Sequence, residues 1–122
     1  MAKQDERRVY KRIDKNFILT YYDKADPSRK YELTQLKNIS MGGMCFITTQ
    51  AYVPSSKMGI ELKTPYLADT THLEGNVLAS HEKVKNIIYE TRIKFDLLSS
   101  ESEFLLAKLI EFFTKSQGKN NG

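Results

Sequence analysis

The chain has 122 residues, of which 40% are hydrophobic and 28% are charged, and this length suits one compact domain and excludes two independent cores. Its 19 lysines and arginines against 15 aspartates and glutamates give a net charge of +4. Residues 1–15 alone hold an excess of +3, so the other 107 residues have a net charge of only +1. This distribution argues against a broad polyanion-binding surface and favours a small anionic ligand bound near the N-terminus.

Several classes of protein and site are excluded by what the sequence lacks. No apolar run approaches the ~20 residues of a membrane span, and the N-terminus has no signal-peptide stretch, so we expect no membrane span and a cytoplasmic protein. A single cysteine, Cys45, excludes an internal disulfide, and its apolar neighbours predict a buried thiol. His72 and His81 have no further ligand at metal-binding spacing, so we predict no metal site. No cofactor-binding or catalytic motif is present, and we expect a binding protein, not an enzyme.

Six segments are rich in β-branched and aromatic residues or alternate with the strand period of two, and they predict β-strands. Turn chemistry at residues 26–28 separates the first two segments, and polar residues 80–83 separate the last two. In chain order the six predicted strands are residues 17–22, 31–36, 44–48, 60–63, 72–79 and 87–95.

The last predicted element is an amphipathic helix over residues 101–115. Ser100 followed by Glu103 matches a capping box at its start. We therefore predict a mainly β fold, a six-stranded antiparallel β-barrel followed by a C-terminal α-helix. The predicted organisation is a flexible arginine-rich segment (1–16), the barrel with its helix (17–115) and a disordered tail (116–122). The apolar residues at helical spacing are Phe104, Leu105, Leu106, Leu109, Ile110, Phe112 and Phe113.

One candidate binding motif is the run Arg7-Arg8-Val9-Tyr10-Lys11-Arg12. The spacing of Arg8 and Arg12 places both on one face of a helix or of an extended chain. The planar fork of arginine makes paired hydrogen bonds to phosphate oxygens or to guanine, and it also stacks on a base. The simpler interpretation, a solvated basic tail with no fixed partner, stays open on this motif alone.

The second candidate motif is Asn38-Ile39-Ser40-Met41-Gly42-Gly43. It is typical of a turn, in which Asn and Ser bond nearby amides and the glycines supply a positive φ or a bulge. The same residues also suit ligand binding, because a short amide and a hydroxyl can bond a base edge and glycine leaves room for the ring. The motif taken alone favours the turn.

Together the two motifs resemble those of the PilZ domain family. The Arg-x-x-x-Arg motif precedes the first strand, the Asn-x-Ser-x-x-Gly motif follows 26 residues later, and a barrel-and-helix pattern comes after it. The resemblance covers essentially the whole chain and includes Gly59 and the strand end Ile93-Lys94-Phe95. The chain departs from the family in having Arg92 where glycine is frequent, and in having no tryptophan. Arg92 could be a solvated strand residue or an additional cation near the site.

The resemblance implies a receptor for the bacterial second messenger cyclic di-GMP. By similarity, Arg8 and Arg12 would clamp the phosphates and a guanine edge. An arginine at position 7 favours two stacked ligand molecules per chain. The expected barrel residues of the site, which would receive a guanine, are Asn38, Ser40 and Gly43, with Gly42 as a permissive neighbour.

We expect the ligand to change the conformation of the chain and its affinity for an unidentified protein partner. An alternative is an adaptor that acts without ligand in pilus, flagellar or polysaccharide assembly, for which loss of the motif residues would be the sign. A third hypothesis, a single-stranded nucleic-acid binder, is disfavoured because tracking a nucleic-acid backbone needs a longer positive groove than a near-neutral domain offers.

Overall fold

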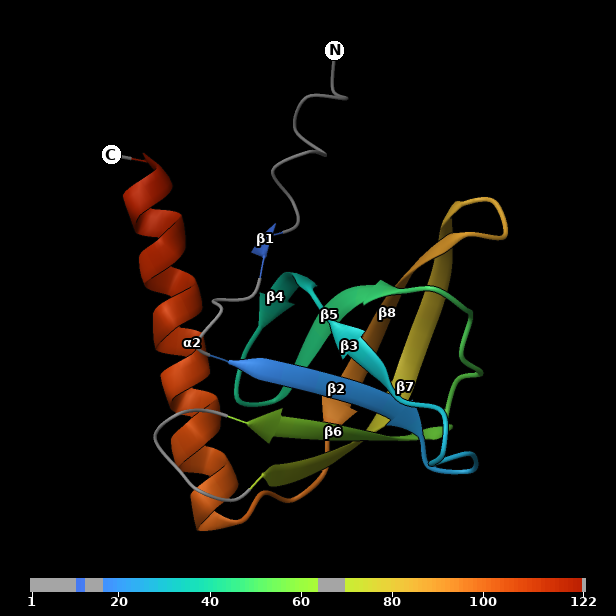
Figure 1. Cartoon of the computed structure of the whole chain (residues 1–122), viewed down its shortest axis with the longest axis horizontal. Coiled ribbons are helices and arrows are strands. Elements are labelled where there is room, and N and C mark those ends of the chain that lie inside the picture. The colour runs from blue at the N-terminus through green and yellow to red at the C-terminus, as the bar shows by residue number, and fades with distance from the viewer. Residues whose placement is uncertain (1–10, 13–16, 64–69, 122) are drawn as a thin grey trace.

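The fold is mainly β, with one curled antiparallel sheet and one C-terminal helix (Figure 1). The computed structural model describes residues 11–12, 17–63 and 70–121, and the side chains of 12, 17–63 and 70–114. The sheet order is β1-β4-β5-β8-β7-β6-β2-β3, with every neighbouring pair antiparallel. The elements are β1 (Lys11–Arg12), β2 (Ile18–Asp23), β3 (Tyr31–Leu33), β4 (Gln35–Ile39), β5 (Gly43–Thr48), β6 (Lys57–Lys63), β7 (Thr71–Val84), β8 (Ile88–Phe95) and α2 (Ser100–Asn121).

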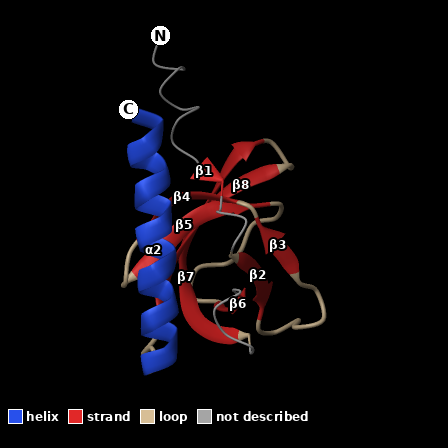
Figure 2. Ribbon diagram, turned by 60° about the vertical axis from the view of Figure 1, so that its left-hand side comes forward, coloured by secondary structure: helices blue, strands red, loops and turns tan. Residues whose placement is uncertain are grey.

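The predicted β class, antiparallel pairing and C-terminal helix are confirmed, but the predicted six strands are wrong. The predicted strand over residues 31–36 is divided at Thr34 into β3 and β4, which lie at opposite regions of the sheet order. β3 pairs with β2, whereas β4 pairs with β5 and with the two-residue β1. The chain therefore turns a corner at Thr34, and the sheet curls into a half-barrel (Figure 2).

The hairpin of β7 and β8 is longer than the sequence pattern predicts. Residues 80–83, the predicted connector, belong to β7, and the turn lies at Asn86, which has a φ of 62°. Ile87 N–H donates to the carbonyl of Val84 across this turn (2.9 Å). The end of the hairpin is exposed, so its polar residues need not alternate with apolar ones.

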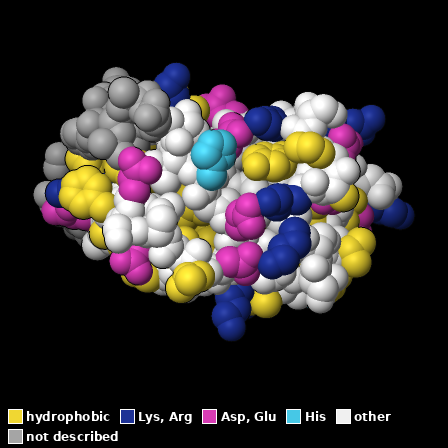
Figure 3. Space-filling view, turned by 90° about the horizontal axis from the view of Figure 1, so that it is seen from below, with side chains coloured by type: hydrophobic (Ala, Val, Ile, Leu, Met, Phe, Trp, Pro, Cys, Tyr) yellow, Lys and Arg dark blue, Asp and Glu magenta, His cyan; other side chains and the backbone are white. Residues whose placement is uncertain are grey.

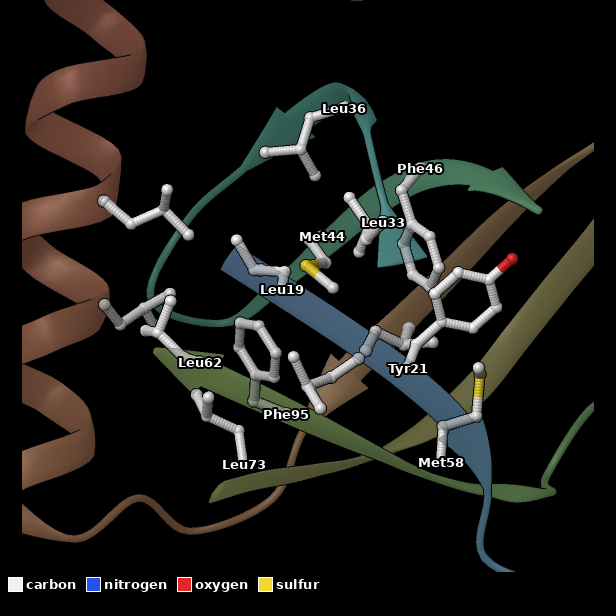
Figure 4. Packing of buried hydrophobic residues seen from close by; sticks show 14 of the residues in the cluster. Leu19, Tyr21, Leu33, Leu36, Met44, Phe46, Met58, Leu62, Leu73 and Phe95 are labelled. Carbon is white, nitrogen blue, oxygen red and sulfur yellow. The ribbon is translucent and has the colours of Figure 1, made fainter. Parts of the chain in front are cut away.

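Alternate residues of the strands point into one hydrophobic core (Figure 4). Leu19 and Tyr21 of β2 are buried in this core together with Phe46 of β5, and the rings of Tyr21 and Phe46 lie edge to face with centroids 5.2 Å apart. From α2, Leu105 and Leu109 are completely buried in the same cluster. The helix thus covers one side of the curled sheet and completes the core, as Figure 2 shows.

The N-cap residue of the helix lies one position earlier in the chain than predicted. Ser99, and not Ser100, is the N-cap, because its Oγ accepts a hydrogen bond from the backbone N–H of Ser102 (3.1 Å). Its carbonyl accepts from the N–H of Glu103 (2.9 Å). The helix also runs past the predicted end at residue 115 and reaches Asn121, so residues 116–121 of the predicted disordered tail are helical.

Candidate functional site

The second motif forms the tight connection between β4 and β5. Ser40 N–H donates to the carbonyl of Gly43 (2.9 Å), and Gly42 N–H donates to Ser40 Oγ (3.2 Å). The predicted turn is therefore confirmed, and the Ser40 hydroxyl is part of it. This turn also fixes the Ser40 side chain beside the start of β5.

The glycines of the motif have a different role from the one predicted. None of the glycines in the described part of the chain has a positive φ. A Cβ on Gly43 would lie 2.2 Å from the carbonyl oxygen of Ile93, whereas a Cβ on Gly42 would meet only Ser40 Oγ at 3.8 Å. Gly43 is thus required for the close approach of β5 to β8, and Gly42 has space beside it.

The motif borders an open pocket of about 360 Å³ on strands β4, β5 and β8, which we call the β4–β5–β8 pocket. All four barrel residues predicted for the site are brought together there. The lining residues are Asn38, Ser40, Gly42, Gly43, Met44, Leu78, Arg92, Ile93 and Lys94.

The floor of this pocket is the outer face of the sheet. Asn38 is opposite Cys45 on the neighbouring strand, and Cys45 is opposite Arg92 on the next, so the three side chains lie on one face. Met44 and Phe46, on either side of Cys45 in the chain, point to the core instead. Cys45 is fully buried, as predicted, and burial, with the nearby charge of Glu90, raises the pKa of its thiol.

The charge of the pocket is positive. Its lining includes Arg92 and Lys94 but no carboxylate. A second pocket, of about 260 Å³ beside the β2–β3 turn, is lined by both acidic and basic groups, including Asp23, Asp26 and Arg29. The face in Figure 3 likewise shows acidic and basic side chains intermixed. The β4–β5–β8 pocket therefore suits an anion better than either of these surfaces.

The arginine motif is only partly described. Arg7 and Arg8 lie outside the described residues. Arg12 belongs to β1, is exposed, and is opposite Gln35 of β4. Because β4 also contains Asn38, the pairing brings the end of the first motif onto the strand that begins the second, as Figure 1 shows for β1 and β4.

The lining residues that the sequence did not predict for the site include Lys94 and Leu78. Lys94 shares a face with Arg92 because the two are separated by one residue of β8, a relation that the strand period could have revealed. Leu78 lies at a register shift between Val77 and Ala79, which gives no local sequence signal.

Comparison with known proteins agrees with this fold. The sequence matches the PilZ domain over residues 6–112. The structure is similar to Bacillus subtilis Inhibitor of motility (MotI/DgrA), with a TM-score of 0.55, 13% identity, and coverage of 90% of this chain and 51% of that one. It is also similar to MrkH of K. pneumonia, with a TM-score of 0.58, 14% identity, and coverage of 88% of this chain and 49% of that one. This chain thus spans about half the length of both structures, and no curated protein matches it.

Among the described residues, no helical segment has both the length and the apolar character of a membrane span. The same residues include no group of three or more histidine, cysteine or acidic side chains placed to hold a metal ion.

Proposed function

Because the chain belongs to the PilZ domain family, a cyclic di-GMP-binding family, we propose that it is a cyclic di-GMP receptor whose binding site is the β4–β5–β8 pocket together with the arginine motif. The observation that supports this most directly is the meeting of Asn38, Ser40 and Gly43 around one cationic pocket. The ligand has two anionic phosphates and two guanines. The pocket offers short polar groups for a base edge and positive charge for a phosphate.

In this proposal the two motifs have different tasks. Arg8 and Arg12 clamp the phosphates and a guanine edge, while Asn38 and Ser40 receive a guanine on the outer face of the sheet. Gly42 leaves space at the turn. Arg7 adds a cationic plane on which a further guanine can stack, so we propose two stacked ligand molecules per chain.

The output that we propose is a change in protein binding. Ligand binding holds the arginine motif against the β4–β5–β8 pocket, and the surface formed by both has a higher affinity for a protein partner. The free energy available for this change is limited to the difference in ligand affinity between the two conformations.

Isothermal titration calorimetry with cyclic di-GMP tests the proposal. We expect binding at micromolar concentrations or tighter, and a loss of at least tenfold in Arg8→Ala and in Ser40→Ala. Arg29→Ala and Ser28→Ala are matched controls, because both residues lie in the exposed turn between β2 and β3. A stoichiometry of one ligand per chain at saturation would overturn the stacked pair.

Two other results would overturn the receptor itself. No binding by the unmutated chain would favour the adaptor that acts without ligand. Binding of a single-stranded oligonucleotide that persists in Arg8→Ala, without binding of cyclic di-GMP, would favour the nucleic-acid hypothesis.

A further inference from the structure

Strand β8 contributes two cations to the β4–β5–β8 pocket that neither motif contains. Arg92 and Lys94 both line it. They are separated by one residue of the strand, so they project from the same face about 7 Å apart along it. Lys94 is opposite Gly43, the last residue of the second motif, and Arg92 lies across β5 from Asn38, since Cys45 is opposite both.

The acidic residues that flank these cations along the chain form ion pairs with other lysines. Glu90, two residues before Arg92, forms an ion pair with Lys37 (3.0 Å). Asp96, two residues after Lys94, forms one with Lys57 (2.9 Å). Within the described residues, neither Arg92 nor Lys94 forms an ion pair of its own.

The side chain of Arg92 interacts with the thiol of Cys45, and the carboxylate of Glu90 reaches the same thiol. Because burial raises the pKa of that thiol, Cys45 stays protonated at neutral pH and does not neutralise the guanidinium. Glu90 forms its ion pair with Lys37 and does not line the pocket, so Arg92 and Lys94 are the charged groups that the pocket presents to a ligand.

We propose that Arg92 and Lys94 together bind a phosphate group of cyclic di-GMP, on the side of the pocket opposite Asn38 and Ser40. This inference rests on the proposed function and adds to it a phosphate subsite built on the barrel, separate from the N-terminal arginine motif. A guanine edge can be bound by the fork of one arginine alone. A lysine beside it adds a compact charge with three donors and no acceptor, which suits phosphate oxygens.

The test is calorimetric titration of cyclic di-GMP into the full chain and into Arg92→Gln, Arg92→Lys and Lys94→Gln. We expect each glutamine variant to bind about tenfold more weakly, as for loss of a charge-assisted hydrogen bond. Arg92→Lys should keep the affinity within about threefold of that of the unmutated chain, because a phosphate can be bound by the positive charge of lysine without the planar guanidinium group. Lys83→Gln, on the exposed part of β7, is the matched control and should change affinity by less than about twofold.

Salt supplies a second readout. The affinity of the unmutated chain should fall as potassium chloride is raised from about 50 to about 300 mM, and it should fall less in the two glutamine variants. Thermal unfolding of every variant checks the fold. If Arg92→Gln unfolds because its interaction with Cys45 is lost, Lys94→Gln and its salt dependence decide the question.

The outcomes separate this inference from the proposed function. If the unmutated chain binds cyclic di-GMP and both glutamine variants have affinities within twofold of it, the phosphate subsite is overturned and the receptor proposal stands. Arg92→Lys as weak as Arg92→Gln would also overturn it, because that result indicates a guanine edge. An unmutated chain that does not bind cyclic di-GMP overturns both.

Discussion

Gly43 lies so close to Ile93 on the neighbouring strand that a Cβ would come within 2.2 Å of the Ile93 carbonyl oxygen. The obstacle is backbone, which cannot move aside as the end of a flexible side chain can. We predict that Gly43→Ala lowers the free energy of unfolding by about 1–3 kcal/mol, as overpacking does. Gly42→Ala should change it by less than about 1 kcal/mol, because a Cβ has space there. Denaturant unfolding measures both, and equal losses would contradict the packing argument.

Ser55 has a φ of 75°, in the left-handed region, within the turn closed by the hydrogen bond from Ser56 N–H to the Val53 carbonyl (3.0 Å). Pro54 at the second position of this turn and the positive φ of Ser55 at the third are features of a type II turn. Such a turn favours glycine at its third position. We predict that Ser55→Gly raises the free energy of unfolding by up to about 1 kcal/mol, and that Ser55→Val lowers it. A lower midpoint of thermal unfolding for Ser55→Gly would contradict this.

Tyr21 is buried among aromatic rings, and burial, with the nearby Tyr52, raises its pKa from 10.0 to about 12. Its folded pKa lies above its unfolded value, so its contribution to stability is complete below pH 10 and is lost as the pH rises from about 10 to 12. We predict that absorbance at ~295 nm shows a late-titrating tyrosine in the folded chain.

The control for this titration is the chain unfolded in guanidinium chloride, in which the seven tyrosines should titrate together near pH ~10. Burial also raises the pKa of Tyr52, so Tyr21→Phe should remove the latest part of the titration and leave the contribution of Tyr52. A single step near pH 10 in the folded chain would show that the Tyr21 hydroxyl is not shielded from water.

Leu109 of α2 is buried against the sheet, whereas Phe104 on the same helix is about half exposed. We predict that Leu109→Ala lowers the free energy of unfolding by about 2–5 kcal/mol, because it leaves a cavity in the core. Phe104→Ala should cost less than about 1 kcal/mol, since it removes mainly exposed surface and a contact with Lys108. Chemical denaturation compares the two, and a larger loss for Phe104 would indicate that the helix packs through another face.

The parts of the fold that the sequence predicted are those specified by local patterns. β-Branched and aromatic residues along β2 and β5, and helical spacing along α2, indicate these elements from the local sequence alone. The corner at Thr34 was missed because it arises from the curl of the whole sheet. The far end of β7 was missed because exposed strands need not alternate.

The residues of the candidate site also fall into those that a local pattern predicts and those that depend on long-range pairing. Asn38 and Ser40 could be identified because they lie within one short motif. Lys94 depends on the register that places it opposite Gly43, which is set by a pairing across the sheet and not by nearby residues. Leu78 depends on an irregularity in β7. Long-range register is therefore what sequence reasoning lacked at this site.

That register also has a consequence for the order of folding. β5 and β8 are about 45 residues apart in the chain, from Thr48↔Tyr89 at one end of the ladder to Gly43↔Lys94 at the other. Such non-local pairs form late, because closing the intervening loop has an entropic cost that local hairpins avoid. The β4–β5 turn and the β7–β8 hairpin can each form early, but neither contains the pocket. A fragment that ends before β8 lacks Arg92, Ile93 and Lys94 of the pocket, so binding at the proposed site would report completion of the fold.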